Sequence, residues 1–208
     1  MALEIIKVCG ITHPADAIAA VQAGATAIGM VFYAPSPRAV KTHEAAVISA
    51  VVPPTALKVG VFVNEEPERI RSLAEAARLD VVQLHGDEGP ETISALSGLR
   101  LWRAFRVGPH FQPAVLEELQ GVEAFLLDGP AGDAYGGAGV PFAWDKAVEA
   151  ARYGKVIIAG GLDGENVAEA IRIAQPWGVD SSSKLERKPG EKDHDKVAAY
   201  ITAAREAG

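Results

Sequence analysis

Cys9, the only cysteine of the chain, follows the first apolar run of the sequence, and Gly10 comes directly after it. A thiol at the end of a strand, beside a residue that lets backbone or a ligand come close, can act as an acid, a base or a nucleophile. The alternative is a small buried apolar side chain, because free cysteines are among the most buried residues in proteins. Cys9 is therefore a candidate for proton transfer whose role depends on its surroundings.

Polar side chains also lie within or at the ends of several other apolar runs. They are Gln83, His85, Arg103, Arg106, Asp128 and Asp180. Each alone is typical of the start of a loop, but strands of one closed parallel barrel share a face at their carboxyl ends, where these side chains would converge. His85 could then orient or polarise a substrate, or it could simply bind a neighbouring backbone group.

Two glycine- and serine-containing segments near the end of the chain are candidates for holding a phosphate. Gly160 and Gly161 follow one apolar run, and Gly178 to Ser183 contains Asp180 and Ser182. Glycines let backbone N–H groups approach an anion, and the loops after the seventh and eighth strands of a barrel are a frequent phosphate site. A tight turn followed by a helix cap is the alternative for each segment, but the two together favour phosphate binding.

Arg38 lies in a loop that Pro35 and Pro37 stiffen. Its guanidinium could make a paired contact with a carboxylate. A solvated loop arginine is the alternative.

The elements that must position these residues alternate between short apolar strands and segments with helical spacing. The expected strands cover 4–9, 27–33, 56–63, 81–85, 100–107, 124–128, 155–159 and 178–182. Asn64 is a predicted helix N-cap, and Asp163 to Asn166 precede a helix with Val167, Ala170, Ile171 and Ala174 on one face.

Near-continuous apolar strands between helices predict a parallel sheet covered by helices. Eight units predict an α/β protein with a closed (β/α)8 barrel, a TIM barrel with short loops, as one domain over 1–208. A doubly wound open sheet is the alternative.

Composition narrows the classes of function. The formal net charge of −7 argues against a nucleic-acid partner, which would need a basic patch. No apolar run approaches the length of a membrane span, and one cysteine points to a reducing compartment, so we expect a cytoplasmic protein without a membrane partner. The remaining histidines, His13, His43, His110 and His194, show no ligand-like spacing, so we predict no metal.

Several of these segments, in order along nearly the whole chain, resemble the phosphoribosylanthranilate isomerases of tryptophan biosynthesis. They are Lys7-Val8-Cys9-Gly10-Ile11-Thr12, Ser36-Pro37-Arg38, Val82-Gln83-Leu84-His85-Gly86, Leu126-Leu127-Asp128, Gly136-Gly137-Ala138-Gly139 followed by Phe142 and Trp144, Ala159-Gly160-Gly161-Leu162, and Gly178-Val179-Asp180-Ser181-Ser182-Ser183. One departure is Lys184, where members of the family commonly carry glycine.

The resemblance implies a (β/α)8 barrel that converts N-(5-phosphoribosyl)anthranilate to 1-(2-carboxyphenylamino)-1-deoxyribulose 5-phosphate, without metal or organic cofactor. It makes Asp128 the general acid and Cys9 the general base of an Amadori rearrangement, and assigns Arg38 to the anthranilate carboxylate. The remaining substrate-binding residues that we expect are His85, Asp180, Gly160, Gly161 and Ser182.

These roles make physical demands. The carboxyl of Asp128 must stay partly protonated and the thiol of Cys9 partly ionised, so both need shifted pKa values. Lys7, two residues from Cys9 along a strand, could assist the thiolate, or it could be a structural lysine inside the barrel.

Other functions and assemblies remain open at this point. Another phosphosugar barrel enzyme, such as an epimerase or an indole-glycerol-phosphate synthase-like enzyme, would share the phosphate loops, and a phosphometabolite-binding module without catalysis is a third possibility. The phosphosugar substrate is the expected small-molecule partner, a homodimer is possible, and the loop from Gly136 to Gly139 could lie over a ligand.

Overall fold

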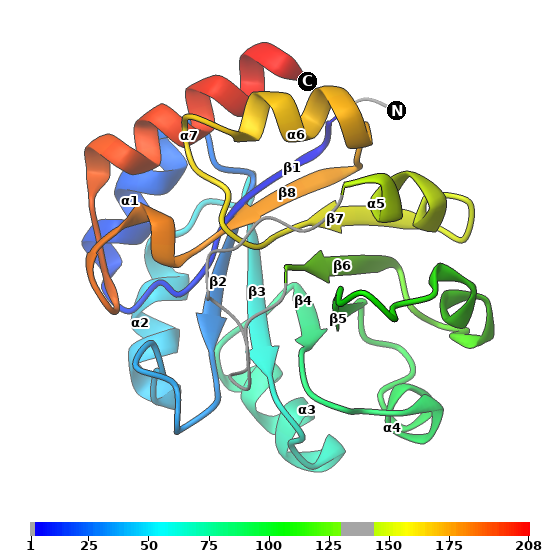
Figure 1. Cartoon of the computed structure of the whole chain (residues 1–208). Helices are drawn as coiled ribbons and strands as arrows, with labels where there is room; N and C mark the ends of the chain where they lie inside the picture. Colours follow the sequence, from blue (N-terminus) through cyan, green and yellow to red (C-terminus); the bar gives the residue numbers. More distant parts are fainter. Residues whose placement is uncertain (1–2, 130–143) are drawn as a thin grey trace.

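Eight parallel strands close into a barrel in the computed structural model, which describes residues 3–129 and 144–208 (Figure 1). The strands are β1 (Ile5–Val8), β2 (Ala27–Val31), β3 (Leu57–Phe62), β4 (Val81–Leu84), β5 (Leu101–Arg106), β6 (Ala124–Asp128), β7 (Lys155–Ile158) and β8 (Gly178–Ser181). The barrel closes where β1 pairs with β8, with Lys7 opposite Asp180. The predicted fold class is confirmed, and each strand ends within two residues of its predicted bounds.

Helices cover the outside of the barrel (Figure 1). They are α1 (Pro14–Ala23), α2 (Thr42–Val51), α3 (Pro67–Ala76), α4 (Pro90–Ala95), α5 (Asp145–Ala150), α6 (Val167–Ala174) and α7 (His194–Ala207). The helix predicted after Asp163 is α6: Asn166 is its N-cap, and the four apolar residues of the predicted face are buried.

Two local expectations are wrong. Asn64 caps no helix: it has φ of 51°, and its side-chain oxygen accepts a hydrogen bond from the backbone N–H of Asp87, while α3 begins at Pro67. Between β5 and β6 the chain forms the 3₁₀-helix η1 (Pro113–Glu118) in place of an α-helix. Its 3₁₀ geometry suits a short piece of chain that prolines and glycines interrupt.

The apolar interior of the barrel sits toward the amino ends of the strands. Trp102 of β5 and Trp177, just before β8, meet edge to face with ring centroids 5.8 Å apart. Aliphatic residues such as Ile5 and Val81 complete this cluster. The amino end is therefore filled by side chains, and polar groups are concentrated toward the other end.

The chain adds an unpredicted hairpin after β8. The short 3₁₀-helix η2 (Ser183–Leu185) leads into β9 (Glu186–Lys188), which pairs antiparallel with β10 (Glu191–Lys192) before α7 begins. This hairpin brings Glu186 and Lys192, both buried, close to the carboxyl end of the barrel.

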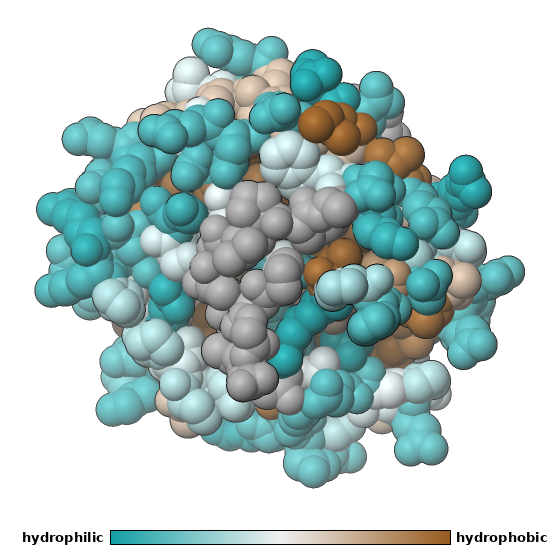
Figure 2. Space-filling model, in the orientation of Figure 1, coloured by the Kyte–Doolittle hydropathy of each residue, from teal (hydrophilic) through white to brown (hydrophobic). Residues whose placement is uncertain are grey.

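The surface is mainly hydrophilic on the face in Figure 2, with apolar side chains in small separate groups. Large apolar side chains that are exposed are distributed over several helices: Ile18, Val47, Val51, Val115, Val148 and Ile173. Within the described ranges, none of the helices has the length and apolar character that crossing a membrane requires.

Candidate active site

A pocket lies at the carboxyl ends of the strands. It is lined by the expected catalytic and substrate-binding residues, but not by Gln83, Arg103 or Arg106: the lining residues are Cys9, Arg38, His85, Asp128, Gly160, Gly161, Asp180 and Ser182. Val31, Val61 and Val63 add an apolar wall. The topology thus brings together residues that are far apart in the sequence, while the predicted loop from Gly136 to Gly139 lies outside the described residues.

Cys9 lies directly beyond β1, with its backbone N–H bonded to the carbonyl of Ser181 at 2.8 Å. Lys7, two residues earlier, is fully buried, and its ammonium lies 2.6 Å from Oδ2 of Asp180. Gly29 of β2 makes room for both: a Cβ there would lie 2.6 Å from Sγ of Cys9 and 3.1 Å from Cε of Lys7. The thiol of Cys9 and the last methylene of Lys7 are therefore packed against the same glycine.

Burial raises the pKa of the Cys9 thiol above its ordinary value of 9.0, although the positive charge of Lys7 opposes the shift. Burial also disfavours the charged form of Lys7, but Asp180 and Cys9 together raise the pKa of Lys7, so it stays positively charged. A general base at this position requires a partly ionised thiol. The structure shifts the thiol pKa the other way, because desolvation outweighs the nearby ammonium.

Asp128 is the last residue of β6, and its Oδ2 lies 3.4 Å from Nε2 of His85. Gln83, fully buried in β4, has its Nε2 3.1 Å from Nδ1 of His85. With this amide as donor, Nδ1 accepts, and the proton of a neutral ring is on Nε2. Nε2 of His85 has no hydrogen-bond partner among the described residues, so the ring is not held by a backbone group and can donate toward the pocket.

The loops after β7 and β8 are tied together at the same end of the barrel. Gly160 has φ of 90°, and a Cβ there would lie 2.8 Å from Cα of Gly129 and 3.0 Å from Oδ1 of Asp128. The hydroxyl of Ser181 donates to the carbonyl of Leu162. Only glycine fits the position of Gly160. The loop that the sequence predicts to bind phosphate therefore lies directly beside Asp128.

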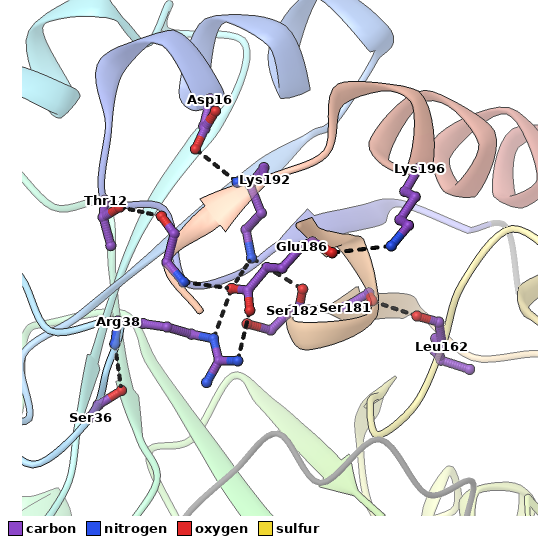
Figure 3. A network of polar contacts seen from close by, with 11 residues as sticks. Thr12, Asp16, Ser36, Arg38, Leu162, Ser181, Ser182, Glu186, Lys192 and Lys196 are labelled. Carbon is purple, nitrogen blue, oxygen red and sulfur yellow. Dashed lines mark hydrogen bonds and ion pairs between the residues drawn. The ribbon is translucent and has the colours of Figure 1, made fainter. Parts of the chain in front are cut away.

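Arg38, in the segment between β2 and α2, already holds a carboxylate (Figure 3). Its Nε lies 2.8 Å from Oε1 and its Nη2 lies 2.7 Å from Oε2 of Glu186. Glu186 also accepts a hydrogen bond from Nζ of Lys192 at 2.9 Å. Sequence reasoning missed Glu186 and Lys192, because a run of charges around a turn is typical of a solvated loop.

Lys184 also lines the pocket, at the position where the sequence departs from the family pattern. It lies in the 3₁₀-helix η2 and does not have the positive φ that would favour glycine. In the part of the chain that the structure describes, no group of three His, Cys, Asp or Glu side chains is placed to hold a metal ion.

The structure is a (β/α)8 barrel. Its carboxyl end gathers a thiol, a carboxyl, an arginine and two glycine- and serine-containing loops, the place where enzymes of this fold have their active sites. The family model for N-(5'-phosphoribosyl)anthranilate isomerase matches residues 6–203. The chain belongs to this family.

Individual relatives agree with this assignment. The chain is 51% identical over 203 residues to the N-(5'-phosphoribosyl)anthranilate isomerase of Solibacter usitatus, covering 98% of each protein. It also resembles a solved phosphoribosyl anthranilate isomerase in complex with reduced 1-(o-carboxyphenylamino)-1-deoxyribulose 5-phosphate, with a TM-score of 0.88, 35% identity and coverage of 98% of this chain and 100% of the other.

A second similar structure is of monomers generated from the dimeric phosphoribosylanthranilate isomerase of Thermotoga maritima. Its TM-score is 0.84 at 34% identity, with coverage of 98% of this chain and 100% of that one.

Proposed function

We propose that this chain converts N-(5-phosphoribosyl)anthranilate to 1-(2-carboxyphenylamino)-1-deoxyribulose 5-phosphate in tryptophan biosynthesis. The observation that carries the proposal is that Cys9 and Asp128, which extend from non-adjacent strands, line one pocket together with the loops after β7 and β8. Membership of the isomerase family and the product analogue bound by a similar structure support the same reaction.

Asp128 is the proposed general acid. It donates its proton to the ring oxygen of the ribose, so the bond between this oxygen and C1 breaks and the nitrogen lone pair forms a Schiff base at C1. Asp128 is left as a carboxylate. Nε2 of His85, to which we assign the ring proton, lies 3.4 Å from this carboxylate without a hydrogen bond to it, so His85 can contact the newly formed hydroxyl beside Asp128.

Cys9 is the proposed general base. As a thiolate it removes the proton from C2, the electrons move to the Schiff-base nitrogen, and the resulting enolamine tautomerises to the ketone. A thiolate with a raised pKa is a strong base but a minor species at neutral pH. The positive charge of Lys7 favours this thiolate, and its Cε lies against the same glycine as Sγ.

The two ends of the substrate are both anionic. We assign the phosphate to Gly160, Gly161 and Ser182, and the anthranilate carboxylate to Arg38. Asp180, whose Oδ1 is buried without a hydrogen-bond partner among the described residues, can accept from a sugar hydroxyl.

The test is the loss of anthranilate fluorescence when the protein is added to freshly generated phosphoribosylanthranilate. We expect rapid loss with the parent protein and a decrease in kcat of roughly 10²–10⁴-fold in Cys9→Ala and Asp128→Ala, the range that general acid–base groups contribute. As a control, the circular dichroism spectrum of each variant is compared with that of the parent to check that the variant is folded. Near-parental turnover in either folded variant removes that residue from the mechanism, and no turnover by the folded parent rejects the function.

The remaining proposals concern location and assembly. We propose a cytoplasmic enzyme, and a homodimer by analogy with the Thermotoga maritima protein. Light scattering during size-exclusion chromatography tests the dimer, because the chain has a mass of 21.8 kDa and a dimer twice that mass.

A further inference from the structure

Arg38, which lines the pocket, forms a compact group of three charged side chains with Glu186 and Lys192 (Figure 3). The side chain of Glu186 is 4% exposed and that of Lys192 is fully buried. Lys192 also donates from Nζ to the carbonyl of Ser182 at 3.1 Å. Two cations share one carboxylate, so the group has a net positive charge where Arg38 meets the pocket.

The contact between Glu186 and Arg38 uses one edge of the guanidinium. A guanidinium is a planar fork with five N–H groups, and it can bind a carboxylate at either of two paired edges. Glu186 occupies the edge formed by Nε and Nη2. The edge formed by Nη1 and the second N–H of Nη2 is the one that remains for a second carboxylate.

The hairpin holds Glu186 in place independently of Arg38. The backbone N–H of Gly190 donates to Oε1 of Glu186 at 3.3 Å, and the hydroxyl of Thr12 donates to the carbonyl of Gly190. The backbone N–H of Lys192 donates to Oδ2 of Asp16 at 3.1 Å. Glu186 is therefore anchored to the barrel through several bonds, whereas Arg38 extends from a loop, so the carboxylate fixes the arginine.

We propose that Glu186 is a positioning residue for Arg38: it binds one edge of the guanidinium so that the other edge presents a paired site for the aromatic carboxylate of the substrate. Lys192 neutralises Glu186, which leaves the positive charge of Arg38 for the ligand. The inference rests on the proposed function, because it takes the arylcarboxylate as the group that Arg38 binds.

Charge and geometry predict opposite effects when Glu186 is changed. Glu186→Gln removes a negative charge near an anionic ligand, so a purely electrostatic role predicts tighter binding. Glu186→Asp keeps the charge but shortens the side chain, which breaks the paired contact. Positioning predicts weaker binding in both variants, about tenfold in KM with kcat within about twofold of the parent.

The experiment compares Glu186→Gln and Glu186→Asp with the parent and with Glu191→Gln. Glu191 lies on the same hairpin in an exposed ion pair with Lys188 at 2.9 Å, so Glu191→Gln is the matched control and keeps the parental KM. Unchanged or lower KM in both folded Glu186 variants overturns the proposal.

A second measurement separates this proposal from the proposed function. Titration of the protein with anthranilate, followed by its fluorescence, measures arylcarboxylate binding without turnover. A separate calorimetric titration with inorganic phosphate measures binding at the other subsite. We expect the Glu186 variants to bind anthranilate about tenfold more weakly and phosphate as the parent does. A parent that binds anthranilate but has no turnover contradicts the function alone, and equal anthranilate affinity in parent and folded variants contradicts the positioning alone.

Discussion

Proton transfer in this site depends on a buried thiol and the charges packed around it. The Cys9 thiol lies between two opposing influences: burial raises its pKa, and the ammonium of Lys7 lowers it. Lys7 is in turn held by Asp180 at 2.6 Å, so the three residues form one electrostatic unit. The sequence placed Lys7 on the correct side of the strand, but the balance between burial and charge needed the packing.

The pH dependence of Cys9 alkylation follows from this balance. Because the thiol pKa lies above its ordinary value of 9.0, the reactive thiolate increases only as the pH rises toward and beyond 9. We expect the rate of alkylation by iodoacetamide to have its midpoint above pH 9, measured by mass spectrometry on the single cysteine of the chain.

Lys7→Met tests the contribution of the ammonium. Removing it should move the alkylation midpoint further up, provided that the variant keeps the circular dichroism spectrum of the parent. A midpoint below 9 in the parent, or the same midpoint in both proteins, would show that this account of the electrostatics is wrong.

The loop after β7 connects the conformation of one element to the catalytic carboxyl. Gly160 has a left-handed φ of 90° and no space for a side chain, since an added Cβ would approach Gly129 and Asp128. Gly98, between α4 and β5, has nearly the same φ, 89°, but open space around it. The two positions therefore separate backbone strain from crowding.

Gly160→Ala and Gly98→Ala should both be destabilised, by roughly 1–3 kcal/mol for backbone strain alone. Gly160→Ala should lose more free energy of unfolding and at least about tenfold in kcat/KM, because the new methyl group displaces Asp128. Urea unfolding and steady-state kinetics on the two variants measure this. Equal kcat/KM in Gly160→Ala and Gly98→Ala would mean that the methyl group at position 160 does not displace Asp128.

Elements differ in how well the sequence predicted them. The strands were predictable because continuous apolar runs bounded by polar or glycine residues are typical of a covered parallel sheet. The role of Asn64 was not predictable, because its side-chain oxygen accepts a hydrogen bond from the backbone N–H of Asp87 in the loop after β4 and caps no helix. The hairpin of β9 and β10 was missed because its charged residues have partners far away: Glu186 binds Arg38, which is 148 positions away in the sequence.

The two ends of the barrel interior have different compositions, one apolar and the other rich in ionisable groups. The Trp102–Trp177 contact and its aliphatic neighbours fill the amino end, and the ionisable groups lie at the carboxyl end. The expected site residues could be identified because the closed barrel brings all strand ends to one face. Their hydrogen bonds and pKa directions could not, because these depend on tertiary partners.

The free energy of unfolding at low pH should depend on the ionisation of Glu186. Burial disfavours its charged form, but hydrogen bonds from Arg38 and the charge of Lys192 lower its pKa below the ordinary 4.5. A carboxyl with a lowered pKa stabilises the fold above the pKa of the unfolded chain, and this contribution is lost as the pH falls through the folded value.

Glu186→Gln should therefore cost about 2–3 kcal/mol of free energy of unfolding at pH 7, somewhat less than the loss of a partner from a fully buried ion pair. The difference from the parent should shrink below pH 4.5, where Glu186 is protonated first in the unfolded chain and then in the fold. Urea unfolding of both proteins from pH 7 down to about pH 3 gives the comparison. A difference that grows toward low pH would reverse the assigned sign.

The solitary thiol also determines how this enzyme can respond to oxidants. A peroxide that reached Cys9 would convert the thiolate to a sulfenic acid, and the usual intramolecular repair is condensation with a second thiol. The chain has no second cysteine, so no internal disulfide can form. Recovery of the proposed base would require an external thiol small enough to enter the pocket, and burial, which raises the pKa of Cys9, also limits how fast the damage occurs.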